Sequence, residues 1–325
     1  MSIAAYLKII GRGKDGARSL GVDESRDLFE QVLDRQVTDL EIGAFCLAMR
    51  IKGESVEELD GFVQAAHARC MDLRGIAERV AAAAPKGIVV LPSYNGARKL
   101  PNLTALLAWA LAREGVRVLV HGVAADPTRV TTAQVFAACK LPIVKQADEL
   151  VAAWQLGQPA FIAIDDLCPS LASLLAVRWT IGLRNPGHTV AKLIDPFAAL
   201  SSSGVRSIRV VNHTHPEYAH SLTAYLAHAH ALAMLMRGTE GEPVADARRQ
   251  PRCDLFVDGQ RREDLSLTPV DGVLTDLPSL PASHEPEETA RYMAAIQAGS
   301  SPLPGPIASQ ARALIQALGC VAPSP

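Results

Sequence analysis

Hydrophobic residues in the first 75 positions recur every three to four residues, which is the spacing of amphipathic helices. One such stripe consists of Ile3, Tyr6, Leu7 and Ile10. Two further helix starts are indicated by capping boxes, Thr38 with Glu41 and Ser55 with Glu58. The pattern predicts a small antiparallel helical domain over residues 1–75. Because short apolar faces of this kind need a partner surface, we expect this domain to form a homodimer.

From about residue 79 onward, short β-branched runs alternate with amphipathic helical stretches. The predicted strands are residues 87–91, 116–120, 161–164 and 208–211, and the predicted helices are residues 103–113, 132–138 and 148–154. Alternation of this kind predicts a mainly parallel sheet with right-handed crossovers. The fold class is therefore α/β, with the helical domain followed by a larger α/β domain over residues 76–325. Functional loops are expected at the carboxyl ends of the strands, in residues 92–102, 121–131 and 165–169.

The loop that follows the first predicted strand carries the most informative motif, the run LPSYNGARKLPNLT from Leu91 to Thr104. A loop between a strand and a helix binds phosphate readily, because the helix start offers unpaired N–H groups and a positive dipole end. Phosphate-binding loops usually contain several glycines, whereas this loop has only Gly96. It carries Arg98 and Lys99 instead. We therefore expect phosphate to be held by cationic side chains here.

Composition and charge narrow the possible functions. The 325 residues are 49% hydrophobic and 20% charged, which is ordinary for a globular protein, and no apolar stretch approaches the ~20 residues of a membrane span. No export signal is visible, and six separated cysteines without a CxxC pair are expected to be free thiols in the cytoplasm. The net charge is −2, but residues 86–145 carry +6, residues 167–237 carry +4 and residues 238–325 carry −5. This segregation is compatible with a cationic face or with scattered surface charges.

Several motifs resemble the anthranilate phosphoribosyltransferase family, and more specifically its YbiB branch. They are the runs Ile10–Lys14, Pro92–Lys99, His121–Arg129 and His215–Tyr218. The resemblance spans nearly the whole chain. It implies the anthranilate phosphoribosyltransferase-like fold and a homodimer. It further implies binding of DNA or RNA without sequence preference.

Three departures from the enzyme pattern argue against catalysis. The glycine-rich pyrophosphate loop of the enzyme becomes residues 92–96, its His-Gly-Asn-Arg turn becomes residues 121–124, and its magnesium-binding Asp-Glu pair falls near Pro243 and Val244. Without those carboxylates a hard cation loses its ligands, and the leaving pyrophosphate loses electrostatic support. We expect no catalytic residue, no metal and no cofactor. Two alternatives remain: a phosphoribosyltransferase with an altered acceptor, because Arg178 matches an anthranilate-contacting arginine of the enzyme, and a small-nucleotide binder.

The candidate site residues form two sets. The candidate nucleic-acid contacts are Arg12, Lys14, Arg18, Arg98, Lys99, Arg129, Arg178, Arg184 and Lys192. For the last three of these, ion pairing inside the fold is an equal alternative. A possible phosphate pocket comprises Asn95, Gly96, Asn102, Thr104 and His121. His213, His215 and His220 fit structural roles better than a metal site, because Pro216 disturbs a fixed ligand spacing.

Overall fold

The computed structural model describes residues 2–275 and 279–320, apart from the Lys14 side chain. The chain forms two compact units. The helical unit contains Met1–Met71 and Ile164–Pro196, and the sheet unit contains Asp72–Ala163 and Phe197–Pro325. Among the described residues, no helix is both long enough and apolar enough to cross a membrane.

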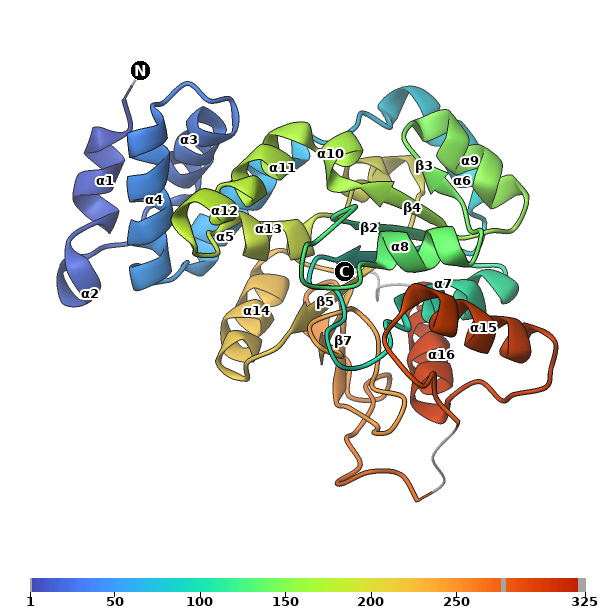
Figure 1. Cartoon of the computed structure of the whole chain (residues 1–325). Helices are drawn as coiled ribbons and strands as arrows, with labels where there is room; N and C mark the ends of the chain where they lie inside the picture. Colours follow the sequence, from blue (N-terminus) through green and yellow to red (C-terminus); the bar gives the residue numbers. More distant parts are fainter. Residues whose placement is uncertain (1, 276–278, 321–325) are drawn as a thin grey trace. The chain divides into compact units, whose positions relative to one another are not determined.

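The helical unit is built from short helices (Figure 1), and aromatic rings pack together in its core. Its N-terminal helices are α1 (Ala4–Ile10), α2 (Gly13–Gly16), α3 (Val22–Leu33), α4 (Asp39–Lys52) and α5 (Val56–His67). The predicted capping boxes are present at the starts of α4 and α5, where the Thr38 and Ser55 side chains accept from backbone N–H groups. In the core, the rings of Phe29 and Phe62 stack with centroids 4.6 Å apart, and the Phe45 ring packs against both.

The second segment of the helical unit departs from the predicted boundary between residues 75 and 76. It holds α10 (Ile164–Leu167), α11 (Pro169–Ala176), α12 (Arg178–Ile181) and α13 (Gly187–Leu193). The prediction of a strand-end loop over residues 165–169 is wrong, because these residues lie in or between α10 and α11. This segment belongs to the helical unit because its helices pack on the N-terminal helices, α11 on α3 and α13 on α5. The Met71 N–H also donates to the Leu167 carbonyl at 2.7 Å.

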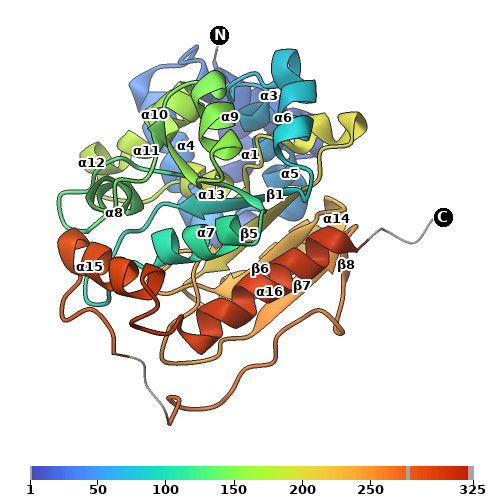
Figure 2. The same ribbon diagram turned by 90° about the vertical axis from the view of Figure 1, so that its right-hand side faces the viewer.

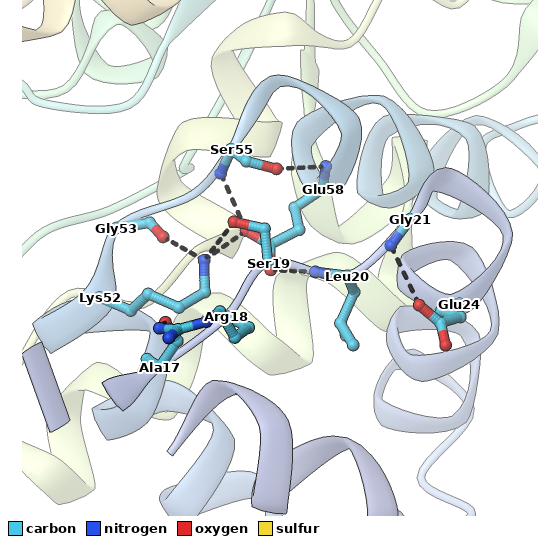
Figure 3. Close-up of polar contacts among 10 residues, drawn as sticks. All are labelled: Ala17, Arg18, Ser19, Leu20, Gly21, Glu24, Lys52, Gly53, Ser55 and Glu58. Atoms are coloured by element: carbon cyan, nitrogen blue, oxygen red, sulfur yellow. Dashed lines mark hydrogen bonds and ion pairs between the residues drawn. The ribbon is translucent and has the colours of Figure 1, made fainter. Parts of the chain in front are cut away.

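A buried ion pair joins the end of α4 to the start of α5 in the helical unit. The Lys52 ammonium lies 2.6 Å from the Glu58 carboxylate, which is fully buried. The same carboxylate accepts from the backbone N–H groups of Leu20 and Ser55 at 3.1 and 2.8 Å. Figure 3 shows these groups converging on Glu58 from three segments of the chain. The carboxylate thereby fixes the loop before α3 to the loop before α5.

The sheet unit contains one eight-stranded sheet in the order β3-β4-β2-β1-β5-β6-β7-β8. Its parallel strands are β1 (Ile88–Ser93), β2 (Arg117–Gly122), β3 (Ile143–Val144), β4 (Ala160–Ala163), β5 (Ser207–His213) and β6 (Ala233–Arg237). The strands β7 (Cys253–Val257) and β8 (Gln260–Arg261) are antiparallel. The predicted α/β class with a mainly parallel sheet is confirmed. The sequence pattern did not reveal β3, β6, β7 or β8.

Helices cover both faces of this sheet. Those of the sheet unit are α6 (Ala77–Ala83), α7 (Thr104–Arg113), α8 (Thr132–Ala138), α9 (Ala147–Gln155), α14 (Glu217–His228), α15 (Pro286–Gln297) and α16 (Gly305–Gly319). Helices α7, α8, α15 and α16 enclose one hydrophobic core with the central strands. In Figure 2, α16 lies along the sheet beside α7. Strands β1, β2, β5 and β6 run parallel, so their carboxyl ends and following loops meet at one edge of the sheet.

Candidate anion-binding site

The loop after β1 lies against the loop after β2. Ala97 and Val130 exchange two backbone hydrogen bonds of 2.8 and 3.0 Å, which form an isolated antiparallel bridge. Gly96 adopts a φ of +71°, and a Cβ there would lie 2.9 Å from the Arg129 side chain, so the bridge requires glycine. Arg129 also donates to the Gly96 carbonyl at 3.2 Å. Arg98 follows Ala97 in the loop after β1, and Arg129 precedes Val130 in the loop after β2. The bridge therefore brings Arg98 and Arg129 close together.

The Arg98 and Lys99 side chains extend from this loop into solvent. Both residues are exposed, and neither side chain makes a hydrogen bond or ion pair with any residue that the structure describes. A third exposed cation, Arg237, ends β6 at the same edge of the sheet. It lies in a strand that the sequence pattern did not reveal, and it was not among the predicted site residues.

The centre of the site is occupied by the carboxylate of Glu242. One carboxylate oxygen accepts from the backbone N–H groups of Asn95 and Gly96, at 2.8 and 2.6 Å. The other accepts from the hydroxyls of Ser93 and of Thr132, the latter at 3.2 Å. Glu242 is only 1% exposed. Two of the residues predicted to hold a phosphate therefore hold a carboxylate of the chain itself.

A second carboxylate, that of Glu240, occupies the next turn of the same loop. One of its oxygens accepts from three consecutive backbone N–H groups, those of Arg98, Lys99 and Leu100, at 2.8, 3.0 and 3.2 Å. Burial raises the pKa of Glu240, but these amide hydrogen bonds outweigh it, and the pKa lies below its ordinary value. Successive N–H groups that point at one anion are a known anion-binding arrangement.

The remaining predicted pocket residues are buried around these donors. The Asn102 side chain donates to the Thr132 hydroxyl at 2.8 Å and accepts from the Thr104 N–H at 3.2 Å, which positions the first turn of α7. His121 instead pairs with a neighbouring ring: its Nδ1 lies 2.7 Å from the Tyr94 hydroxyl. Asn102 and Thr104 therefore support the donor loop, whereas His121 is tied to Tyr94.

Three of the predicted cations cluster in the helical unit. The pKa of His188 is lowered to about 3, first by burial and then by repulsion from Arg184, with smaller contributions from Arg178 and Lys192. Arg184 and Lys192 each lie four residues from His188 in the chain, and the charge of Arg178 also acts on this imidazole. The Arg178 guanidinium additionally stacks on the Trp179 ring, 4.2 Å from its centroid. The helical unit thus contains a cationic cluster that is separate in sequence from the loop of Arg98 and Lys99.

Arg12 and Arg18 are exposed, and both donate to backbone carbonyl groups. Arg12 donates to the Lys8 carbonyl at 2.8 Å, and Arg18 donates to the Ala17 carbonyl at 3.0 Å. Neither forms an ion pair with a carboxylate of the described chain. Lys14 lies in α2, and its side chain falls outside the described part of the structure.

Within the described ranges, no group of three or more His, Cys, Asp or Glu side chains is arranged to hold a metal ion. Glu240 and Glu242 lie just before the Pro243–Val244 position, but their oxygens are directed at N–H and O–H donors. His215 packs near the Tyr218 ring, with centroids 6.5 Å apart.

Comparisons with known proteins agree with this architecture. Residues 5–70 match the helical bundle domain of a glycosyl transferase family. Anthranilate phosphoribosyltransferase from Thermus thermophilus superposes over 93% of this chain and 87% of its own, with a TM-score of 0.67 and 19% identity. The enzyme from Saccharomyces cerevisiae, solved with PRPP and Mg, superposes over 97% and 88%, with a TM-score of 0.66 and 13% identity.

The fold and its strand-end site define the class as an anthranilate phosphoribosyltransferase-like glycosyltransferase fold. More closely, the chain belongs to the family of the uncharacterized protein YbiB of Escherichia coli (strain K12), with which it is 37% identical over 319 residues, 98% of this chain and 95% of that protein. By comparison, identity to an anthranilate phosphoribosyltransferase of Persephonella marina is 27% over 61% of this chain and 55% of the enzyme.

Proposed function

We propose that this protein is a homodimer that binds the phosphate backbone of DNA or RNA without reading the base sequence, and that it does not transfer phosphoribosyl groups. The observation that carries this proposal is the occupation of the β1 loop by Glu240 and Glu242. Five backbone N–H groups of that loop, which would otherwise be available to pyrophosphate, are hydrogen-bonded to these carboxylates.

The cationic side chains of the same loop remain available to a polyanion. Arg98 and Lys99 are exposed, their side chains make no hydrogen bond or ion pair with a described residue, and Arg237 lies at the same sheet edge. Each phosphate that a Lys or Arg neutralises releases condensed counterions, so several such contacts build affinity without any base contact. This chemistry suits DNA or RNA better than a small nucleotide.

Part of the negative charge in the acidic C-terminal part of the chain is balanced locally. Its carboxylates pair with arginines close to them in sequence, as in Asp246–Arg248, Asp254–Arg252, Asp254–Arg261, Glu263–Arg261 and Asp264–Arg262. The four acidic and four basic residues of these pairs cancel one another, so the excess negative charge of residues 238–325 resides in the other acidic residues, of which Glu240 and Glu242 place their carboxylates in the β1 loop.

An unpaired apolar stripe on α4 supports the homodimer. Leu40, Leu47 and Ile51 are 83%, 49% and 54% exposed, and exposed Ala44 lies between them on the same side of the helix. An apolar row of this kind on a helix surface is suited to packing against a second copy of the chain. Two copies would double the number of cations presented to one polyanion and raise its avidity.

The second candidate is a phosphoribosyltransferase with an altered acceptor. It is favoured by the fold shared with anthranilate phosphoribosyltransferases and by the cluster of Arg178, Arg184 and Lys192 around His188. Against it stands the carboxylate-filled β1 loop, which leaves no free amide cradle for the leaving pyrophosphate.

The nucleic-acid proposal is tested by a salt titration of binding to unrelated single- and double-stranded sequences. We expect binding of the natural chain to weaken steeply with salt. Replacing Arg98 and Lys99 together by alanine should weaken binding to all sequences alike. It should also reduce the slope of log K against log salt by about 1 for each phosphate that the variant no longer neutralises.

The matched control removes the same positive charge from the acidic region, as Arg252→Ala with Arg262→Ala. Both of these arginines are held by aspartates. Equal effects of the two double variants on affinity would show that binding follows total charge and not the β1 loop. Binding that ignores salt would refute the proposal.

A further inference from the structure

The Glu242 carboxylate is an unusual buried charge because neutral groups alone hold it. Two backbone N–H groups and two hydroxyls converge on it, and no Lys or Arg forms an ion pair with it within the described structure. A buried carboxylate normally requires a cation or a full set of hydrogen bonds. Two consecutive amides joined by hydroxyl groups form the kind of donor set that proteins build for phosphate and other oxyanions.

The turn that delivers this carboxylate fits the loop closely. Thr239 and Glu242 form a backbone bridge around Glu240 and Gly241, whose φ angles are +51° and +85°. A Cβ on Gly241 would lie 1.7 Å from the Asn95 side-chain nitrogen, so this position accepts only glycine. The Asn95 side chain also donates to the Glu240 carbonyl at 3.0 Å. The turn is therefore docked onto the loop by its backbone as well as by its two carboxylates.

We propose that Glu242 is a built-in ligand that closes an oxyanion site formed by the amides of Asn95 and Gly96 and the hydroxyls of Ser93 and Thr132. The site takes a phosphate or carboxylate group, and in the natural chain it is filled by the chain itself. The inference extends the proposed function, because it explains why a polyanion meets side chains instead of a backbone cradle. It rests on the donor geometry and does not require nucleic-acid binding.

Truncating the built-in ligand should open the site to free anions. In Glu242→Ala, the Asn95 and Gly96 N–H groups lose their acceptor and the Ser93 and Thr132 hydroxyls, which lie 2.6 Å apart, keep each other as partners, so thermal stability should fall. Inorganic phosphate or acetate should restore part of the lost Tm, with a rise that grows with the logarithm of anion concentration, whereas chloride at matched ionic strength should not. The natural chain should show no such specific rise.

Glu242→Gln is the matched control. Its side chain fills the same space: the amide oxygen can accept from the Asn95 and Gly96 N–H groups, and the N–H₂ group can donate to the Ser93 and Thr132 hydroxyls, which also act as acceptors. The site therefore stays filled, and this variant should not respond to phosphate. If Glu242→Ala does not fold in chloride buffer, its refolding yield in phosphate against chloride gives the same comparison. Equal yields, equal Tm values in phosphate and chloride, or phosphate binding by the natural chain that matches the variant would overturn the inference.

The nucleic-acid proposal and the anion-site proposal are tested independently of each other. A salt-dependent affinity for DNA or RNA that depends on Arg98 and Lys99 would stand even if phosphate did not rescue Glu242→Ala. Rescue of that variant would stand even if no nucleic acid bound. Calorimetric titration of inorganic phosphate into Glu242→Ala and into the natural chain measures the anion site directly.

Discussion

Two buried carboxylates, Glu58 and Glu242, illustrate how differently this chain compensates a charge. Glu58 is matched by the Lys52 ammonium and two amides, whereas Glu242 is matched by amides and hydroxyls alone. The first arrangement neutralises charge and joins two loops of the helical unit. The second arrangement contains no cation that neutralises the Glu242 carboxylate. This carboxylate therefore resembles a ligand in a binding site.

The ion pair of Lys52 with Glu58 makes a direct stability prediction. Lys52→Met should destabilise the protein by about 3–5 kcal/mol, because it leaves a fully buried carboxylate without its cation. Urea denaturation measures this change in the free energy of unfolding. Arg26→Met, which breaks an exposed pair with Asp23, should cost less than about 1 kcal/mol. Similar costs for the two variants would contradict the distinction.

At the scale of elements, helix α4 has two apolar sides, one of which is buried and the other exposed. Ile42, Phe45 and Met49 are buried in the helical unit, whereas Leu40, Leu47 and Ile51 face outward. Amphipathic periodicity predicted a helix here, but it could not show which apolar side is covered within the chain. The outward stripe is the surface that we assign to a second copy.

Acidic substitutions on that stripe should separate the two copies. Leu47→Glu with Ile51→Glu places two carboxylates in the proposed interface, and we expect a monomer by light scattering coupled to size exclusion. Arg312→Glu with Gln316→Glu on the exposed side of α16 is the control, and it should leave the molecular mass unchanged. A natural chain that is monomeric at micromolar concentration would contradict the homodimer.

For the whole molecule, the distribution of charge matters more than its sum. In the acidic region from residue 238 onward, Asp246, Asp254 and Asp264 pair with neighbouring arginines, whereas the carboxylates of Glu240 and Glu242 lie in the β1 loop. Those two side chains occupy backbone donors, while the Arg98 and Lys99 side chains form no ion pair with any residue that the structure describes. The molecule therefore combines an anthranilate phosphoribosyltransferase-like fold with a β1 loop whose backbone donors are occupied by its own carboxylates.

The closed loop predicts the outcome of an enzymatic assay. Phosphoribosyl pyrophosphate incubated with anthranilate and other aromatic acceptors should release no pyrophosphate above the enzyme-free rate. The physical reason is that neutralisation of the leaving group needs free donors or a metal. Turnover that disappears in Arg178→Ala would reverse this expectation and establish the second candidate.

The local features of the site could be predicted from the sequence, whereas its central contacts could not. Pro92–Lys99 could be recognised as a strand-end anion loop because the strand, the helix start and the cations are adjacent in the chain. Glu242 could not be linked to it, since 146 positions separate it from Gly96 and no periodicity spans such a distance. Similarly, the sequence placed α10–α13 in the sheet domain because nothing local indicates that α11 packs on α3.

The amino-acid sequence alone determined the helical and β-branched periodicities, the capping boxes, the α/β class and the positions of Arg98 and Lys99, because each depends on neighbours within a few residues. The tertiary structure decided which segments share a unit and what occupies the amides of the β1 loop. Those outcomes depend on strand order and on turns that bring distant residues together. Glu240 and Glu242 reach the loop only because β6 lies two strands away from β1 in the folded sheet.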